Sequence, residues 1–500
     1  MISVNGCFVD EDVLIRESGV HYSKLEKTFT HTVKLGEYYK TAVIVKRSRG
    51  TLIIPRFLAE KYCEIGVLRN LTRKVGTGVS VSFPTFALTP YPYQSTIVDH
   101  VMARYFTPER AAAGFGGVTL EVEAGLGKTF VAALIAARLG LKTLYVVPNE
   151  YLLEQAIDDF ARCFPGIKVG KYYSRAKTDG DVVFIIINSV LSEKIQTPAG
   201  PISPIEYFKQ FGLSIWDEVH EYATDKRSIA FGVAGTRFML GITAEANTRA
   251  DKMDRIVHYG VGPVCIAEEI PGFDVPDNER YTSRVNIISY FGPKEFTRNL
   301  TNDTGNMSAY LMSGQVIEDP NRMNLIVSEV RKLIPQHNIF IWCDMRSCVQ
   351  KICDRLRAEL RDCRVSDPEN NEVGPSDSDS EAPRGLIPAS LMGGATRAEI
   401  RIAQKSQIIV ATYQYAYRGV SLPQFSAMIF ATPRRAKIYQ TLKRIFRMCG
   451  DTSLPRQIVD IVDARTRLRN QLPDRVEQYN RELFGMTIDR TTVKWEDYKD

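Results

Sequence analysis

The sequence predicts an α/β protein with two parallel-sheet units in tandem, preceded by a small β-rich N-terminal accessory domain. Short apolar runs alternate with helical patterns between residues 118 and 243, and the same alternation returns after residue 338. Residues 1–84 instead carry β-rich, basic segments such as TAVIVKRSRGTLIIPRF. Strands that alternate with helices are typical of parallel sheets covered on both faces.

Length and composition place the chain among ordinary globular proteins. Its 500 residues have room for about three domains at roughly 100–200 residues each. A hydrophobic fraction of 44% and a charged fraction of 24% allow large cores and exclude disorder throughout the chain. The net charge of +6 is small for this length, so it permits a polyanionic partner without requiring one.

The cysteines and the N-terminus indicate a reduced, non-membrane protein. The densest of the nine cysteines, namely Cys343, Cys348, Cys353 and Cys363, lack the paired spacing of a zinc site. Charged residues in MISVNGCFVDEDVL occupy the place where a secretory signal has its apolar segment, and no apolar run approaches ~18 residues. We therefore expect an intracellular, soluble protein with reduced thiols.

The first unit is expected over residues 85–270. Its candidate strands are VTLEV (118–122), TLYVV (143–147), VVFIII (182–187), LSIW (213–216) and FMLGI (238–242). The stretches FVAALIAARLG and EYLLEQAIDDFARCF between them have the spacing of amphipathic or buried helices.

The second unit is expected over residues 320–465, after a connecting segment at 271–319. Its candidate strands are NIFIWC, QIIVAT, AMIFAT and QIVDIV, and its helical patterns lie at 346–360, 396–405 and 436–448. Residues 364–385 are acidic, contain no aromatic residue and predict a disordered loop. Residues 466–500 are expected to form a C-terminal helical extension.

A phosphate-binding turn is the strongest local signal. In VEAGLGKTF a candidate strand passes through Gly125, Leu126 and Gly127 directly into a helix. The glycines let backbone N–H groups approach phosphate oxygens, Lys128 can reach the β- and γ-phosphates, and the Thr129 hydroxyl can ligate magnesium. The full pattern has a further glycine where this chain has Val122, and a Gly-rich strand-to-helix turn without a ligand is the alternative.

A second signal is LSIWDEVHE, an apolar strand that ends in two adjacent carboxylates about ninety residues after the turn. Two carboxylates at a strand end are costly without a cation. Asp217 suits magnesium coordination, Glu218 suits polarising the water that attacks a γ-phosphate, and His220 is placed to sense the nucleotide.

Together these residues resemble the superfamily 2 DExH-box helicases, with GKT and DEVH at their two ATPase boxes. The resemblance covers roughly residues 85–450 and implies two RecA-like lobes that use ATP and Mg²⁺ and bind nucleic acid. In LTPYPYQ, it makes Gln94 the candidate reader of the adenine base. It also makes Pro148, in YVVPNEYLLEQ, and Asn188, in INSVLS, candidate contacts to a nucleic-acid backbone.

The remaining motifs follow in the order that the family has. GITAEANTRAD resembles the coupling motif, so Thr243 and Ala244 would link hydrolysis to strand movement, although Glu245 departs from the usual pattern. In ATYQYAYRGVSLP, Thr412 is the candidate backbone contact and Gly419 would face ATP. The family usually has acidic residues in this motif, and this chain lacks them. A nucleotide contact made by a carboxylate of this loop is therefore in doubt.

QTLKRIFRM resembles the family's arginine-bearing helix, in which Gln440, Arg444 and Arg447 would face the nucleotide. Residues three apart share a helix face, so both guanidinium groups could stabilise charge on the γ-phosphate. Lys443 stands where the family commonly has glycine.

The resemblance implies an ATP-dependent helicase that translocates on nucleic acid, with DNA favoured and RNA as an alternative. The linking segments HYGVGPV and IPRF are most similar to DExH helicases of large DNA viruses, including the poxvirus transcription-associated type, and of phages. This implies a role in viral transcription or replication, with transcription machinery as partner and the host cytoplasm, virus factory or virion as location. Two alternatives remain: a duplex translocase that does not unwind, and a nucleotide-dependent transcription scaffold without turnover.

Overall fold

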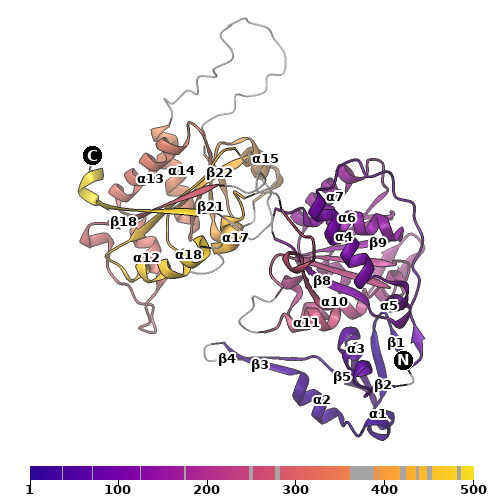
Figure 1. The fold of residues 1–500 in the computed structure, drawn as a ribbon. Coiled ribbons are helices and arrows are strands. Elements are labelled where there is room, and N and C mark those ends of the chain that lie inside the picture. Colours follow the sequence, from indigo (N-terminus) through magenta and orange to yellow (C-terminus); the bar gives the residue numbers. More distant parts are fainter. Residues whose placement is uncertain are drawn as a thin grey trace, which may run out of the picture. The chain divides into compact units, whose positions relative to one another are not determined.

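The computed structural model of the chain divides into two compact units, Met1–Asp274 and Val275–Asp500. It describes residues 1–35, 38–69, 71–123, 125–173, 176–246, 252–275, 282–360, 388–393, 395–416, 424–434, 438–446, 453–480 and 486–499. The predicted acidic loop at 364–385 lies outside these residues. Figure 1 shows the elements of both units, which we describe separately.

Unit 1 is built on an eight-stranded sheet with the order β11-β10-β12-β9-β15-β16-β8-β17. Its strands are β8 (Gly116–Glu121), β9 (Thr143–Val147), β10 (Val169–Tyr173), β11 (Ala176–Thr178), β12 (Val182–Ile186), β15 (Leu213–Asp217), β16 (Phe238–Thr243) and β17 (Val264–Ile266). All pairs are parallel except β10 with β11. The five strands expected from the apolar runs are therefore confirmed, with carboxyl ends at one edge.

Helices cover both faces of this sheet, as a parallel sheet requires. They are α4 (Pro92–Arg104), α5 (Pro108–Ala113), α6 (Lys128–Leu139), α7 (Glu150–Cys163), α8 (Ile187–Val190), α9 (Pro204–Phe208), η1 (Val219–Tyr222), α10 (Asp225–Val233), α11 (Arg255–Gly260) and η2 (Ala267–Glu269). In Figure 1, α4, α6 and α7 lie on one side of the sheet and α10 and α11 on the other. A short hairpin, β13 (Ile195–Thr197) with β14 (Gly200–Ile202), precedes α9.

The N-terminal segment has a five-stranded sheet of its own, ordered β5-β6-β2-β1-β7, and a separate hairpin. Its elements are β1 (Ile2–Ser3), β2 (Gly6–Asp10), α1 (Glu11–Ser18), α2 (Tyr22–Phe29), the hairpin β3 (Thr30–Leu35) and β4 (Tyr38–Val43), β5 (Lys46–Ser48), β6 (Thr51–Ile54), α3 (Arg56–Glu64) and β7 (Arg73–Lys74). The β-rich character expected from the sequence is present.

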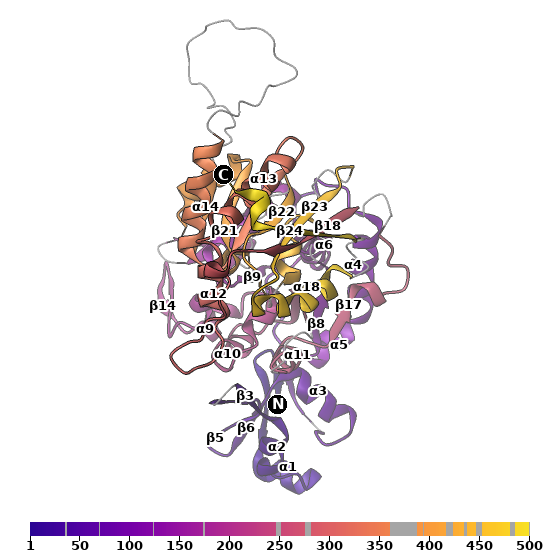
Figure 2. The same cartoon turned by 90° about the vertical axis from the view of Figure 1, so that its left-hand side faces the viewer.

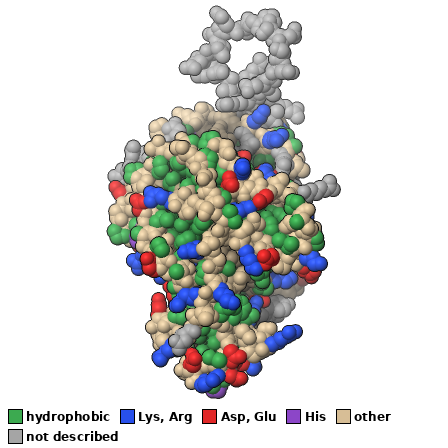
Figure 3. Space-filling view, turned by 90° about the vertical axis from the view of Figure 1, so that its right-hand side faces the viewer, with side chains coloured by type: hydrophobic (Ala, Val, Ile, Leu, Met, Phe, Trp, Pro, Cys, Tyr) green, Lys and Arg blue, Asp and Glu red, His purple; other side chains and the backbone are tan. Residues whose placement is uncertain are grey.

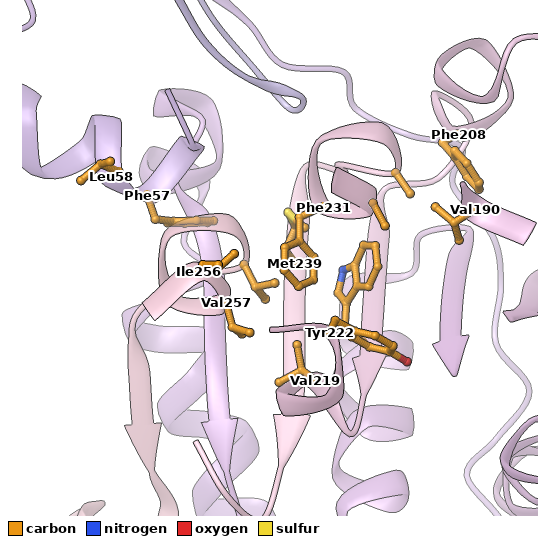
Figure 4. Packing of buried hydrophobic residues seen from close by; sticks show 14 of the residues in the cluster. Phe57, Leu58, Val190, Phe208, Val219, Tyr222, Phe231, Met239, Ile256 and Val257 are labelled. Atoms are coloured by element: carbon orange, nitrogen blue, oxygen red, sulfur yellow. The ribbon is translucent and has the colours of Figure 1, made fainter. Parts of the chain in front are cut away.

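This segment shares a hydrophobic core with the large sheet, so a domain boundary at residues 84/85 is not what the structure has. One cluster of buried side chains runs from Ile2 to Val261. Figure 4 shows Phe57 and Leu58 of α3 beside Ile256 and Val257 of α11. Helix α3 lies so close to β8 that a Cβ on Gly117 would be 2.2 Å from the Phe57 ring.

Arg56 fixes the same junction. Its exposed fraction is 2%, and its guanidinium donates to the backbone oxygens of Thr236 (2.5 Å), Gly116 (3.1 Å) and Arg237 (3.2 Å). Buried polar groups are stable when hydrogen-bonded, so this cation stabilises α3 against the ends of β8 and β16.

Unit 2 is built on a seven-stranded, wholly parallel sheet with the order β20-β21-β19-β22-β23-β18-β24. The strands are β18 (Ser283–Phe291), β19 (Asn338–Cys343), β20 (Ala389–Leu391), β21 (Ile408–Thr412), β22 (Phe425–Phe430), β23 (Arg456–Asp463) and β24 (Met486–Lys494). The helices are η4 (Lys294–Phe296), α12 (Ala309–Val316), α13 (Pro320–Leu333), α14 (Arg346–Glu359), α15 (Arg397–Lys405), α16 (Tyr413–Ala416), α17 (Ile438–Leu442), η5 (Arg467–Gln471), α18 (Leu472–Tyr479) and η7 (Trp495–Tyr498).

Two expectations about this unit are wrong. The supposed connecting segment at 271–319 contains β18, which pairs with β23 along eight residues. The supposed helical extension at 466–500 contains η5 and α18 but also the strand β24, which pairs with β18 along nine residues. Figure 2 shows β18 and β24 side by side. These segments are strands because they extend a sheet whose core strands lie far away in sequence.

Buried ion pairs fix β23 in this sheet. Arg322 of α13 pairs with Asp463, and Arg475 of α18 pairs with Asp460 at 2.8 Å, with each side chain at most 1% exposed. Tyr479 also donates to Asp460 at 2.8 Å. Each pair joins β23 to a different helix, so removing one partner would leave a buried charge.

In the described part of the chain no helix is both long and apolar enough to cross a membrane. The described Cys343, Cys348 and Cys353 are buried free thiols, and burial raises the pKa of both Cys348 and Cys353 to about 11. No group of side chains suited to a protein-only metal site occurs among the described residues. Cys363 lies outside them.

Candidate active site

The phosphate-binding turn connects β8 to α6, as the sequence predicts. Gly125 and Gly127 have backbone φ angles of +96° and +77°, values that residues with a Cβ rarely adopt. A Cβ on Gly127 would also lie 2.4 Å from the amide nitrogen of Gln94. Helix α6 begins at Lys128 without a side-chain cap, so its first N–H groups are available to an anion.

Gln94 supports this turn from α4. Its Nε2 donates to the backbone oxygen of Leu126 at 3.1 Å, and its Oε1 accepts from the backbone N–H of Tyr91 at 3.1 Å. The side chain is 5% exposed. The structure therefore shows Gln94 holding the turn, and its role in reading adenine stays a prediction.

Asp217 is the last residue of β15 and is 8% exposed. Its Oδ1 accepts from the backbone N–H of Glu218 at 2.9 Å, and its Oδ2 accepts from the hydroxyl of Tyr145 at 3.2 Å. Burial, followed by the negative charge of Glu218, raises the pKa of Asp217 to about 7, and the positive charge of Lys128 opposes this shift. The acidic pair and the lysine therefore act on one another electrostatically.

Tyr145 joins the turn to the acidic strand end, a role that the sequence did not predict. Its buried hydroxyl is hydrogen-bonded with both Thr129 and Asp217, the two candidate magnesium ligands. Burial raises its pKa well above the ordinary value, so the hydroxyl stays protonated. The only sequence signal was a hydroxyl-bearing ring in the otherwise apolar run TLYVV.

Glu218 has a left-handed backbone conformation, with φ at +46°. A residue with a Cβ adopts this conformation at a cost of about 1–3 kcal/mol, and such strain is concentrated at functional sites. The turn takes the Glu218 side chain out of the strand direction, and its Oε2 lies 3.5 Å from Nδ1 of His220.

His220 also reaches the coupling motif. Its Nδ1 lies 2.8 Å from Oγ1 of Thr243, the last residue of β16, and this oxygen accepts from the backbone N–H of Glu245 at 3.0 Å. The backbone oxygen of Thr243 accepts from Val122, which directly follows β8. Thr243 thus links the acidic turn to the phosphate-binding turn, and Ala244 follows it at the same edge.

The candidate nucleic-acid contacts of unit 1 lie at this edge too. Pro148 follows β9, and Asn188 lies in α8, directly after β12. These strands are parallel neighbours with Val147 opposite Ile186. Pro148 is buried and Asn188 is exposed, so only the latter presents its side chain to a ligand.

In unit 2, Thr412 ends β21 and is 5% exposed. Gln440 lies in α17, but its side chain is not described, and Gly419 and Arg447 lie outside the described residues.

The expected helix over 436–448 is wrong. Helix α17 ends at Leu442, and Arg444 lies in the turn that follows, with an exposed fraction of 9%. In that turn, the backbone N–H groups of Arg444 and Ile445 each donate to the backbone oxygen of the residue three positions earlier. The buried Arg456 side chain donates to the Ile445 backbone oxygen at 2.7 Å, which satisfies the carbonyl outside a helix. The shared helix face assumed for the two arginines is therefore not supported.

Comparison with known proteins shows what the chain is similar to. Residues 87–247 match the family described as "Type III restriction enzyme, res subunit". A protein of African swine fever virus, provisionally named an ATP-dependent RNA helicase, is 26% identical over 508 residues, which cover 93% of this chain and 90% of that protein. A similarly named mimivirus protein is 26% identical over 383 residues, which cover 76% of this chain and 65% of the mimivirus protein. The chain is thus a helicase-type enzyme that is similar to the superfamily 2 helicases.

The solved structure of the Mycobacterium smegmatis helicase Lhr bound to single-stranded DNA and AMP-PNP shares the fold of this helicase-type enzyme. The two structures match with a TM-score of 0.50 and 17% sequence identity, and the match covers 81% of this chain and 49% of the Lhr chain. The likeness agrees with two RecA-like lobes in tandem.

The described residues fit ATP with Mg²⁺. The positive φ of Gly127 forms the turn, a Cβ there would collide with the Gln94 side chain that holds it, and Lys128 begins the helix beside it. Thr129 and Asp217 share the Tyr145 hydroxyl, so both candidate magnesium ligands lie within reach of one group. A cation at Asp217 would offset the burial and like-charge repulsion that raise its pKa.

Proposed function

We propose that unit 1 binds MgATP at the turn between β8 and α6, and that Glu218 polarises the water that attacks the γ-phosphate. The observation that carries this proposal is the hydrogen-bonded set of Thr129, Tyr145 and Asp217 beside Lys128. Lys128 would contact the β- and γ-phosphates, and Mg²⁺ would neutralise charge on the transferred phosphoryl group.

The buried aspartate sets a condition on binding. With its pKa raised to about 7, a fraction of Asp217 carries a proton near neutral pH. A metal ligand must be deprotonated, so binding at Asp217 would release that proton to solvent. The Tyr145 hydroxyl donates to the carboxylate and so favours the charged form that binding needs.

Hydrolysis would be transmitted through His220 and Thr243. His220 lies 3.5 Å from the Glu218 carboxylate and 2.8 Å from the Thr243 hydroxyl, so it contacts both the water-polarising residue and the coupling motif. A change in the charge near Glu218 would therefore alter the hydrogen bonding of Thr243 and of the segment that follows β16.

We further propose that this ATPase translocates on nucleic acid and separates strands, with DNA as the substrate and viral transcription or replication as the process. Asn188 and the neighbourhood of Pro148 in unit 1 and Thr412 in unit 2 would contact the backbone, giving salt-sensitive and largely sequence-independent binding. The viral relatives are provisionally named RNA helicases, so RNA is the necessary comparison substrate.

The test is an ATPase assay of the wild type and Lys128→Ala with single-stranded DNA, duplex DNA and RNA in parallel. We expect nucleic acid to stimulate the wild type and the variant to lose that activity. Lys142→Ala is a control of the same chemical change. Lys142 directly precedes β9, at the amino end of that strand, where it pairs with Asp179 at 2.7 Å, and it has no proposed role in catalysis. Unchanged turnover in Lys128→Ala would refute the assignment.

A translocase that moves on duplex without unwinding shares the same site residues. A strand-displacement assay beside a triplex-displacement assay separates the two, because a pure translocase is active only in the second. The scaffold without turnover is disfavoured by the enzyme class and by the presence of Lys128 and Glu218.

A further inference from the structure

A polar pocket lies in unit 2, between the segments that follow β18 and β23. Its volume is about 610 Å³, and it is lined by Lys294, Thr297, Asn299, Arg465, Arg467 and Arg469 together with small or polar neighbours. These segments follow adjacent parallel strands, so the pocket lies at the carboxyl edge of the sheet. None of the motifs that resemble the helicase family contributes to it.

The charge of this pocket is uncompensated. Its lining contains four basic side chains and no carboxylate. Among the described residues no ion pair involves any of the four, and Arg465 and Arg469 donate instead to the neutral backbone oxygens of Gly292 (2.8 Å) and Ala464 (3.4 Å). By contrast, Arg322, Arg434 and Arg475 of the same unit each have a carboxylate partner.

The face drawn in Figure 3 has a different character from the pocket. On the face drawn in Figure 3, Lys and Arg side chains are interspersed with Asp and Glu. A pocket that gathers four cations without an acid is therefore a local feature, and not a consequence of the small net charge of the chain.

The fold holds these cations in place. In ARTRLRN, the residues Arg465, Arg467 and Arg469 are exposed while Thr466 and Leu468 between them are buried. Leu468 packs against Met312 and Val316 of α12, and the Thr466 hydroxyl accepts from the Leu468 N–H at 3.2 Å.

The opposite wall is joined to the arginines by Asn299, whose side-chain oxygen accepts from the backbone N–H of Arg467 at 2.8 Å. Both walls of the pocket are thus positioned by buried packing or by hydrogen bonds, so the cations are available to an external anion.

The chemistry of the lining favours phosphate over other anions or bases. Guanidinium groups bind phosphate oxygens in a bidentate manner, and Thr, Asn and backbone N–H groups are common further donors to phosphate. The lining includes no aromatic side chain on which a base could stack.

The pocket also lies on the same edge as Thr412, with β19 and β22 between β21 and β23. Three strand spacings of ~4.8 Å separate the two places by ~14 Å, a distance that a few nucleotides span.

We propose that this pocket binds backbone phosphates of the nucleic acid and extends its path beyond Thr412 along unit 2. The inference rests on the proposed function, because it assumes a nucleic-acid substrate. The contact is to phosphate and so is independent of base sequence.

The test compares Arg467→Gln/Arg469→Gln with Arg401→Gln/Arg490→Gln, a control pair of exposed arginines that removes the same charge at positions outside the pocket lining and not adjacent to it in sequence. Binding of a fluorescent single-stranded oligonucleotide is measured by anisotropy across a salt series. Loss of phosphate contacts lowers the slope of log Kd against log salt by roughly one per contact. We expect a slope reduced by about one to two and at least ~10-fold weaker binding at low salt for the pocket pair only.

The outcomes separate this proposal from the proposed function. A wild type that does not bind the oligonucleotide contradicts the function itself. Binding by the wild type with equal slopes for the two double variants overturns the pocket proposal. A pocket variant with an altered KM for ATP in the absence of nucleic acid assigns the pocket to a free phosphate compound, and also overturns it.

Discussion

At the scale of single residues, Tyr145 connects the two halves of the candidate site. Its hydroxyl is hydrogen-bonded with Thr129, from the phosphate-binding turn, and with Asp217, from the acidic strand end. Because it is fully buried in the sheet, the position of this hydroxyl is determined by packing.

We predict that Tyr145→Phe shifts the pH dependence of ATP hydrolysis. The Tyr145 hydrogen bond lowers the pKa of Asp217, so its loss moves the ascending limb of kcat/KM to higher pH. A hydrogen bond contributes about 0.5–1.5 kcal/mol, so the shift is up to about one pH unit. Tyr172→Phe, which loses a hydroxyl bonded to the Gln196 N–H, is the matched control. An unshifted limb in Tyr145→Phe contradicts the prediction.

Asp217 also predicts a pH dependence of stability. Its folded-state pKa of about 7 lies above the ordinary 3.8, so the folded state binds more protons between these values. The contribution of Asp217 to stability is therefore present below about pH 4 and is lost as pH rises to about 7. Asp217→Asn should weaken this trend in thermal unfolding midpoints measured without Mg²⁺. A variant with the same trend as the wild type would show that other groups cause it.

At the scale of elements, a contact between His220 and Thr243 joins the ends of β15 and β16. We predict that Thr243→Val retains ATP hydrolysis but lowers strand displacement per ATP by roughly 5- to 150-fold, the usual range of a coupling energy between sites. The measurement is strand displacement divided by phosphate released. Thr119→Val removes a buried hydroxyl of neighbouring β8 that donates to Gly262, and it should leave the ratio unchanged. If strand displacement per phosphate released is equal in the two variants, Thr243 has no role in coupling.

The fixation of β23 gives a stability prediction for unit 2. Arg475→Met leaves Asp460 buried without its cation, which costs about 3–5 kcal/mol. For a unit of this size the thermal midpoint should fall by roughly 6–20 °C. Arg284→Met removes an exposed partner of Asp489 and should change the midpoint by little. Similar midpoints for the two variants would show that the buried pair contributes no more than a surface pair.

At the scale of the whole molecule, the family resemblance predicts that an arginine of the 440–448 segment supplies positive charge for ATP hydrolysis. Arg447→Ala should retain ATP affinity and lose ~10³–10⁵ in turnover, because such an arginine acts mainly in the transition state. Arg298→Ala is the control for loss of one exposed charge. Nucleotide binding and single-turnover hydrolysis are measured separately, and equal losses in both would mark Arg447 as a structural residue.

The sequence by itself determined the parallel sheets and the elements of the candidate nucleotide site. Apolar strands such as those that end at Val147 and Asp217 are recognisable because both of their faces are buried, and GLGKT and DEVH carry their chemistry in adjacent residues. The helix over Arg346–Glu359 follows from local periodicity in the same way.

The tertiary structure alone decided what depends on distant contacts. Strand β24 is mostly exposed and polar, so only its pairing with β18 makes it a strand. The segment after Leu442 is a turn and not the helix that local spacing favoured, and the distant Arg456 satisfies the Ile445 carbonyl there. The role of Tyr145 and the shared core of the N-terminal segment likewise arise where residues far apart in sequence pack together, because their energies come from partners that no local pattern specifies.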